Sequence, residues 1–255
     1  MNFSKVDSSN EPKVILIAVG GPTCSGKTTL AKHLRKILPN STILHQDDFA
    51  PSSDKIPIHP IHGLPDWDSP QGAIEWLRFR KMLRDLHSDA KTPMPPSHDA
   101  LNIQPDVPID DSRLSDSINR FKDLGQDFRF VLVDGFLLYW DKDCVEEYDV
   151  KLFVRESHDT LKERRRVRQM YHTADGQTWI DPPGYWDKII WPAYLMAHQH
   201  MFQNKDVVRG EVDRKNWAGK QAVVLQPTPV DPGPTTMTAF VEQALDSIYE
   251  RVKNH

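Results

Sequence analysis

The chain has 255 residues, of which 38% are hydrophobic and 27% charged, and 32 Lys and Arg against 36 Asp and Glu give a net charge of −4. This balance is typical of a globular protein and argues against one whose main task is to coat nucleic acid or an anionic membrane. Cys24 and Cys144 are too few for a disulfide framework or a four-ligand zinc site, so the sequence predicts a reducing compartment. Residues 1–13 are polar, so we expect no secretory signal there. The longest apolar runs have five or six residues, which is too short for a membrane-spanning helix of roughly 20 residues. We expect a cytoplasmic location, with the nucleus as the alternative.

Strand and helix patterns alternate along the chain, which predicts an α/β fold around one parallel sheet. The apolar run Val14–Val19 is typical of a strand buried on both faces. An apolar stripe predicts a helix over Lys27–Leu38, which Pro39 ends. The remaining predicted strands cover residues 41–46, 130–133, 149–154 and 222–225, and the remaining predicted helices cover 70–86, 111–124, 157–168, 187–204 and 235–253. Residues 1–12 are expected to form a flexible tail, and 13–255 a single domain.

Several segments are expected to be irregular because they are rich in proline and polar residues. Residues 50–66 predict a loop, after which Ser69-Pro70 reads as a helix start with a serine cap and proline in the first turn. Residues 85–125 predict a loop-rich insertion or a flap on the substrate side. Residues 169–184 predict a polar loop.

Residues Gly21 to Thr28 read G-P-T-C-S-G-K-T and match the phosphate-loop pattern G-x-x-x-x-G-K-S/T at every position. A predicted buried strand precedes the match and a predicted amphipathic helix follows it, as the pattern requires. Such a loop points consecutive N–H groups at phosphate oxygens, and the helix N-terminus adds its dipole. We expect Lys27 to reach the β- and γ-phosphates of ATP and the Thr28 hydroxyl to ligate Mg²⁺. The residues expected to bind ATP here are Gly21, Pro22, Thr23, Cys24, Ser25, Gly26, Lys27, Thr28 and Thr29.

Other strings indicate which kind of phosphate-loop protein this is. A GTPase needs the guanine-reading string N-K-x-D, but the nearest match, Asn204 to Val207, has valine in place of the aspartate. The switch string D-x-x-G at Asp181–Gly184 follows no predicted strand. A motor ATPase or transporter subunit would need more machinery than this chain has room for. These exclusions favour a kinase that phosphorylates a small molecule.

Carboxylates follow two of the predicted strands, at the sheet edge that faces the ligand crevice of an open parallel sheet. Asp47 and Asp48 end the second strand, and Asp134 ends the strand over 130–133, where a Walker-B acid belongs. A carboxylate there can accept a proton from an attacking hydroxyl or bind Mg²⁺. The pattern does not choose between Asp47 and Asp48, and a turn or capping role is the alternative for all three.

An arginine cluster ends the predicted helix over 157–168 and consists of Arg164, Arg165, Arg166 and Arg168. Alone, such a cluster is more typical of a solvated helix face or a nuclear-import signal. Beside a phosphate loop, it favours a lid over residues 164–184 that neutralises charge on the transferring phosphoryl group.

Five strings occur in the order found in nicotinamide riboside kinases: Gln46-Asp47-Asp48-Phe49, Trp67-Asp68-Ser69-Pro70, Asp134-Gly135-Phe136, Arg164–Tyr171 and Asp181–Asp187. The long middle segment resembles the fungal form of this family, which belongs to the uridine kinase and phosphoribulokinase-like group. The resemblance covers roughly residues 13–204. It implies a P-loop NTPase fold and transfer of the ATP γ-phosphoryl to the 5′-hydroxyl of nicotinamide riboside. The product would be nicotinamide mononucleotide, an intermediate of NAD biosynthesis, and nicotinic acid riboside would be a second acceptor.

The resemblance also implies a role for each matching residue. Asp47 would accept the proton of the 5′-hydroxyl and lie near Mg²⁺, with Thr28 and Asp134 as further metal ligands. The implied acceptor-pocket residues are Asp47, Asp48, Phe49, Trp67 and Asp68, with Tyr171 on the nicotinamide side. In the lid, either Arg165 or Arg166 would reach the substrate, and Arg168 would fill the next position over ATP. The expected catalytic residues are Asp47, Lys27 and Arg165.

Two other functions stay open on the residues alone. A uridine or cytidine kinase needs hydrogen-bonding groups for a polar pyrimidine edge, whereas a flat pyridinium ring favours aromatic stacking, to which Trp67 and Tyr171 are suited. A nucleotide-binding regulator without turnover is disfavoured by the presence of four residues: Lys27, Thr28, Asp47 and Asp134. We expect nicotinamide riboside and ATP as partners and no nucleic acid or membrane. The sequence leaves the choice between monomer and homodimer open.

Overall fold

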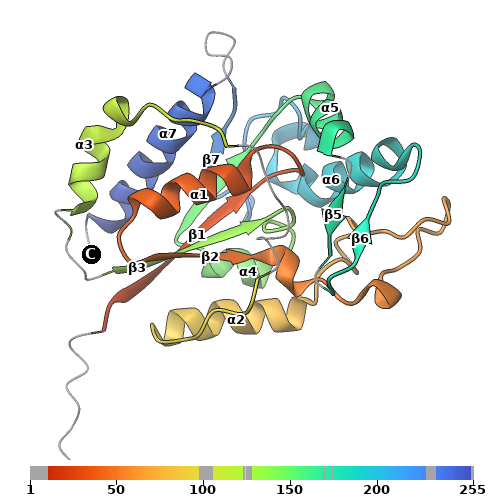
Figure 1. Cartoon of the computed structure of the whole chain (residues 1–255), viewed down its shortest axis with the longest axis horizontal. Helices are drawn as coiled ribbons and strands as arrows, with labels where there is room; N and C mark the ends of the chain where they lie inside the picture. Colours follow the sequence, from red (N-terminus) through yellow and green to blue (C-terminus); the bar gives the residue numbers. More distant parts are fainter. Residues whose placement is uncertain are drawn as a thin grey trace, which may run out of the picture.

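The structure is a computed structural model that describes residues 11–97, 106–122, 124, 128–168, 170–173, 175–227 and 234–253. Most of the predicted tail and parts of the predicted insertion therefore lie outside the described residues. Five strands of the described chain form one parallel sheet in the order β2-β3-β1-β4-β7 (Figure 1). They are β1 (Lys13–Gly20), β2 (Ser41–His45), β3 (Phe128–Gly135), β4 (Val150–Val154) and β7 (Ala222–Leu225). The predicted α/β fold with a single parallel sheet is confirmed.

Helices cover both faces of this sheet, as the continuous apolar sequence of β1 predicts. One face carries α1 (Lys27–Ile37), α3 (Asp111–Lys122) and α7 (Pro234–Val252), and the other carries α2 (Trp76–Ser88), α4 (Lys142–Glu147) and α6 (Trp191–His198) (Figure 1). Alternate residues of β1 serve the two cores: Ile15 and Ile17 face α1 and α7, whereas Leu16 and Ala18 face α2. No helix among the described residues has the length and apolar character needed to cross a membrane.

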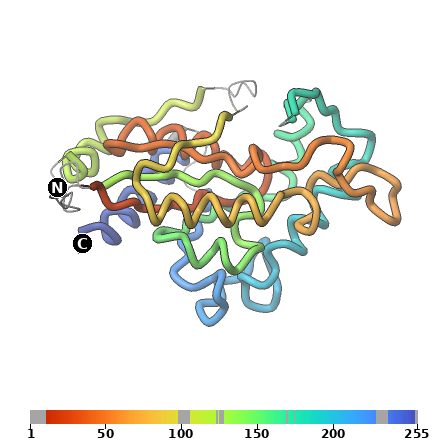
Figure 2. The backbone as a smooth tube through the Cα atoms, turned by 90° about the horizontal axis from the view of Figure 1, so that it is seen from below, coloured from red at the N-terminus to blue at the C-terminus, as the bar shows by residue number. Residues whose placement is uncertain are grey.

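The carboxyl ends of the strands meet at the edge from which the phosphate loop and the Asp47 turn leave the sheet. In Figures 1 and 2, the start of β1 and the end of α7 lie at one end of the molecule. The other end holds α5 (His158–Arg168), the two-stranded hairpin of β5 (Tyr171–His172) and β6 (Thr178–Trp179), and the loop after β2. The candidate site lies between the sheet edge and this group of segments.

The predicted helix start at Ser69-Pro70 is wrong, because α2 begins at Trp76. The N–H groups of Gly72 and Ala73 both bond to the Ser69 carbonyl, so the serine and proline begin one turn and not a helix. Gly72 lies against Pro57, and the Trp76 indole donates to the Pro70 carbonyl at 2.6 Å. These contacts override the local helix signal.

Two further predictions need correction at the same end of the molecule. The predicted polar loop over 169–184 contains the β5–β6 hairpin. The predicted helix over 187–204 is divided into a π-helical turn (Trp186–Ile190), α6 and two 3-10 turns (Gln199–Met201 and Gln203–Lys205). Pro192, which stands in the first turn of α6, has no N–H to donate to the preceding turn, which accounts for the irregular start.

The described part of the 85–125 insertion does not form a flap on the substrate side. Helix α3 packs on α7, where Arg113 pairs with Glu242 and Arg120 pairs with Asp246. Its buried residues Leu114 and Phe121 join the core beneath α7. None of the described insertion residues lines the pocket described below.

Candidate active site

The phosphate loop joins β1 to α1 and passes close to the end of β4. Gly21 has a φ of +144°, and a Cβ at this position would lie 2.3 Å from the Val154 carbonyl oxygen, so only glycine fits. Gly26 caps α1 with a φ of 95° in the left-handed region that glycine tolerates. No acidic residue stands in the first turn of α1, so its positive end is left for an anion.

Polar groups around this loop point to a ligand. The Ser25 Oγ and Asp134 Oδ1 atoms are buried and have no hydrogen-bond partner among the described residues. Because buried polar atoms in proteins are nearly always hydrogen-bonded, ligand atoms are the natural partners here. The Lys27 Nζ makes a long 3.4 Å bond to the Pro22 carbonyl, a weak contact that phosphate oxygens can replace. Thr29 does not line this pocket but borders a second hollow, beside Lys32 and His33.

Asp134 is held by a histidine that sequence reasoning missed. His45 and Asp134 are direct partners in the register of β2 and β3, and the His45 Nδ1 lies 3.1 Å from the Asp134 Oδ2. Burial favours the neutral carboxyl, but the His45 hydrogen bond and the positive charge of Lys27 outweigh it, so the pKa of Asp134 is lowered. Asp134 is therefore an ionised carboxylate with one oxygen held by protein and the other oxygen turned to a site that also contains the Thr28 hydroxyl.

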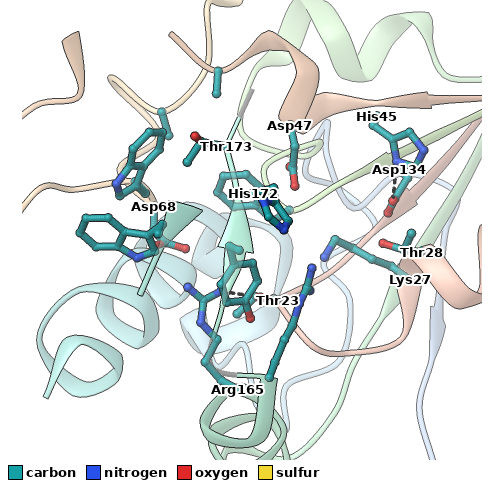
Figure 3. Close-up of a pocket in the computed structure, with 17 residues that line it drawn as sticks. Thr23, Lys27, Thr28, His45, Asp47, Asp68, Asp134, Arg165, His172 and Thr173 are labelled. Atoms are coloured by element: carbon teal, nitrogen blue, oxygen red, sulfur yellow. Dashed lines mark hydrogen bonds and ion pairs between the residues drawn. The ribbon is translucent and has the colours of Figure 1, made fainter. Parts of the chain in front are cut away.

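Asp47 and Asp48 have different surroundings because the short 3-10 turn Gln46–Phe49 carries them in different directions. Asp47 lines the pocket, and in Figure 3 it points between the His45–Asp134 pair on one side and Asp68 on the other. Asp48 is buried outside the pocket lining, and its carbonyl accepts from Arg78. Phe49 is 2% exposed and packs edge-on against Phe79. Asp48 and Phe49, which were predicted to contact the acceptor, are thus not among the lining residues, and both anchor the turn to α2.

Arg168 and Arg165 both line the pocket, and Arg165 is held there by a carboxylate. The Arg165 guanidinium donates to both carboxylate oxygens of Asp181 at 2.7 and 2.8 Å and to the Thr23 Oγ1 at 3.0 Å. Burial disfavours the charged guanidinium, but the Asp181 carboxylate outweighs this effect and raises the pKa of Arg165. A permanent positive charge is thus fixed beside the phosphate loop, where it can stabilise a phosphoryl group.

The structure answers the question of arginine register that the sequence left open. Arg166 is exposed, pairs with Glu163 at 2.7 Å and is not among the residues that line the pocket. Arg165 and Arg168 both lie over the Tyr171 ring, at 3.7 and 4.1 Å from its centroid. The Tyr171 hydroxyl lies 3.5 Å from the Cys24 Sγ in the phosphate loop. Tyr171 therefore lines the pocket next to the phosphate loop, and it is also the cross-strand partner of Trp179 in the β5–β6 hairpin.

The far end of the pocket combines a carboxyl group with an aromatic wall. Asp68 lies across the pocket from Lys27 (Figure 3). Burial, partly offset by Arg165, raises the pKa of Asp68 to about 7. The rings of Trp67 and Trp179 are in contact, with centroids 5.9 Å apart and planes tilted by 56°. The Trp179 indole donates to the Asp181 Oδ1 at 2.9 Å, so the carboxylate that holds Arg165 also holds this wall.

Residues that sequence reasoning did not single out complete the lining. They are His45, Ala50, Ala73, Phe136, His172, Thr173 and Trp179. Of these, only Phe136 stood within a motif, the D-G-F string. The others follow or precede motifs by a few residues, and no periodicity marks them.

A phosphate loop at the edge of a parallel sheet, two carboxylates at neighbouring strand ends and a lid arginine define a phosphate-loop kinase of small molecules. No protein-family model matches the chain. The chain is 34% identical to the nicotinamide riboside kinase of Schizosaccharomyces pombe over 212 residues, which are 80% of this chain and 87% of that protein. It is 32% identical to the nicotinamide riboside kinase of Saccharomyces cerevisiae over 86% of this chain and 91% of that protein. Human nicotinamide riboside kinase 2 is 29% identical over 74% of this chain and 70% of that protein.

The chain therefore belongs to the nicotinamide riboside kinase family, and the family resemblance of its motifs is confirmed.

Proposed function

We propose that this enzyme transfers the γ-phosphoryl group of ATP to the 5′-hydroxyl of nicotinamide riboside and forms nicotinamide mononucleotide. The observation that carries the proposal is the arrangement of the pocket. Lys27 and Arg165 lie at the phosphate loop, Asp68 and the Trp67–Trp179 wall lie at the far end, and Asp47 points between them.

The far end of the pocket suits the acceptor, and the phosphate-loop end suits ATP. A flat pyridinium ring gains stacking and cation–π attraction on the tryptophan wall, about 0.5–2 kcal/mol. Asp68, next to this wall, can accept hydrogen bonds from the two ribose hydroxyls. The 5′-hydroxyl then lies toward Asp47, whose carboxylate can accept its proton while Lys27 and Arg165 hold the phosphates.

We include Mg²⁺ in the proposal because the protein atoms near the loop fit it. The buried Asp134 Oδ1 has no protein partner among the described residues, and the Thr28 hydroxyl contributes to lowering the pKa of this carboxyl. The described residues contain no cluster of three or more His, Cys, Asp or Glu side chains that could enclose a metal. Asp134, Thr28 and Asp47 would thus hold a cation that keeps water and phosphate oxygens as its other ligands, as Mg²⁺ does. When bound, Mg²⁺ neutralises the charge of the β- and γ-phosphates.

An ADP-release assay across four acceptors tests the proposal: nicotinamide riboside, nicotinic acid riboside, uridine and cytidine. We expect kcat/KM for nicotinamide riboside to exceed that for uridine by about 2–30-fold, because a pyrimidine gains no cation–π attraction. Nicotinic acid riboside is expected to be a second acceptor, and EDTA should abolish turnover. A higher kcat/KM for uridine would support a pyrimidine nucleoside kinase, and no ADP release with any acceptor would support a regulator without turnover.

A further inference from the structure

The tip of the β5–β6 hairpin is tied to the loop that follows Asp47. The Asp175 Oδ2 accepts two hydrogen bonds from Ser53, one from the backbone N–H at 2.9 Å and one from the hydroxyl at 2.6 Å. These bonds join residues 122 positions apart in the sequence. Ser53 opens a 3-10 turn, Ser53–Lys55, and Asp175 stands at the exposed turn of the hairpin.

Other hydrogen bonds hold the Asp175 carboxylate in the orientation in which it contacts Ser53. Its Oδ1 accepts from the Thr173 hydroxyl at 2.5 Å, and the Gln177 N–H also bonds to this carboxylate. The hydrogen bonds of Ser53 and then those of Thr173 hold the pKa of Asp175 well below its usual range, so the group stays ionised at neutral pH. No ion pair of the described residues involves Asp175, so its bonds to Ser53 are the strong tertiary contact of this turn.

The two segments joined in this way both contribute residues to the pocket lining. The hairpin contributes Tyr171, Thr173 and Trp179 to the lining, and the loop after β2 contributes Asp47 and Ala50. The base of the hairpin has its own attachments, since Tyr171 contacts Arg165 and Trp179 contacts Trp67. The Ser53–Asp175 contact therefore holds the tip of the hairpin against the loop after β2.

We propose that Ser53 and Asp175 are positioning residues that latch the hairpin over the acceptor, so that they govern acceptor binding and not the phosphoryl-transfer step. Neither residue lines the pocket, and both act through the hairpin residues that do. The latch is exposed and consists of hydrogen bonds, which suits a contact that opens to admit the acceptor and closes over it. Its effect on kinetics rests on the proposed function, but its effect on hairpin motion does not.

The first test measures hairpin motion without substrate, by hydrogen exchange with mass spectrometry on the full chain. The variants are Ser53→Ala and Asp175→Asn, with Ser53→Thr as the conservative rescue because it keeps the hydroxyl. Ser52→Ala is the matched control, since no described hydrogen bond joins its side chain to the hairpin. We expect exchange of the peptides over 50–56 and 170–181 to rise several-fold in Ser53→Ala and Asp175→Asn. Exchange in Ser53→Thr, in Ser52→Ala and in the α3 peptide should stay at the wild-type rate.

The second test measures steady-state kinetics with nicotinamide riboside. Loss of one charge-assisted hydrogen bond changes an equilibrium by about tenfold, so the KM for nicotinamide riboside should rise about tenfold while kcat is retained. Ser53→Asp, which sets a second carboxylate against Asp175, should raise KM further. Wild-type exchange in both peptides would overturn the latch, and so would faster exchange throughout the chain, because global destabilisation would then explain it. A fall in kcat with unchanged KM would also overturn it. Absence of kinase activity in the wild-type enzyme would contradict the proposed function, and the exchange result would still decide the latch.

Discussion

The fold keeps the Asp68 carboxyl in an environment that opposes its charge. Desolvation, opposed by Arg165 and reinforced by Asp181, Asp66 and Asp47, raises the pKa of Asp68 from 3.8 to about 7. An acid with a raised pKa in the folded state binds its proton more tightly there than in the unfolded chain. Ionisation of Asp68 therefore lowers the free energy of unfolding. This loss is absent below about pH 4, grows between pH 4 and 7, and is complete above pH 7.

The magnitude follows from the size of the shift. A shift from 3.8 to about 7 is roughly three pKa units, or about 4 kcal/mol at 1.36 kcal/mol per unit. Because the side chain is partly open to the pocket, we expect about half of this value, ~2 kcal/mol, in Asp68→Asn at pH 8. The gain in unfolding free energy should shrink toward zero as the pH is lowered to 4.

Denaturant unfolding of wild type, Asp68→Asn and Asp116→Asn at several pH values measures this gain. Asp116 is exposed on α3 and is the matched control, for which no gain is expected. A gain of equal size at pH 5 and pH 8, or no gain at all, would refute the reasoning, because the effect must follow the ionisation of Asp68.

The same substitution should impair the enzyme. Charge-assisted hydrogen bonds to the ribose hydroxyls contribute about 1.5–3 kcal/mol, so kcat/KM for nicotinamide riboside should fall roughly 10–150-fold. The loss should be smaller for the 2′-deoxy analogue. In the wild type, kcat/KM should rise with pH through about 7, as Asp68 ionises. If this rise persists in Asp68→Asn, another group is responsible for it.

The remaining predictions concern kinetics measured by ADP release. Lys27→Ala should lower kcat by at least about 100-fold with an unchanged unfolding midpoint, because a fixed charge on the phosphates is lost; near-normal activity would contradict the phosphate-loop assignment. Asp47→Asn should lower kcat about 10²–10⁴-fold with little change in KM, whereas Asp48→Asn should mainly destabilise the protein; the reverse pattern would exchange the two roles. Arg165→Gln should lower kcat strongly, and Arg166→Gln, on an exposed side chain, should leave kcat and KM unchanged; equal effects would argue against the lid geometry. Trp179→Ala should reduce the preference for nicotinamide riboside over uridine about tenfold, and an unchanged preference would assign the wall to Trp67 alone.

The phosphate end of the site could be predicted from the sequence because its residues adjoin strands. The loop between β1 and α1 is one continuous motif. Asp134 follows the apolar run over 130–133, and Asp47 follows the short strand predicted over 41–46. The choice between Asp47 and Asp48 could not be made, since it depends on the direction in which a 3-10 turn leaves β2. The His45–Asp134 pair could not be predicted for a related reason. The two residues are partners because β2 and β3 are neighbours in the sheet, and no local sequence pattern indicates the order of the strands.

The acceptor end was harder to predict because it is built from loops. Trp179 stands in a polar segment without periodicity, and only the pairing of Tyr171 with Trp179 shows that the segment is a hairpin. The choice between the lid arginines stayed open for a different reason. Three consecutive arginines on a helix point in directions about 100° apart, and only the position of Asp181 decides which of them enters the pocket.

Asp181 also links the two ends of the pocket physically. Its Oδ1 accepts from the Arg165 guanidinium at 2.8 Å and from the Trp179 indole at 2.9 Å. Arg165 in turn donates to Thr23 of the phosphate loop, and Trp179 contacts Trp67 at the acceptor wall. If the Asp181 carboxylate moves toward one of these partners, it moves away from the other. The position of the Arg165 guanidinium therefore depends on the packing of Trp179 in the acceptor wall. Groups that share one anchor in this way are not energetically independent, because removing either partner changes the bonds of the other. In the proposed function, a ring stacked on Trp179 would contact a residue that shares the Asp181 anchor with Arg165.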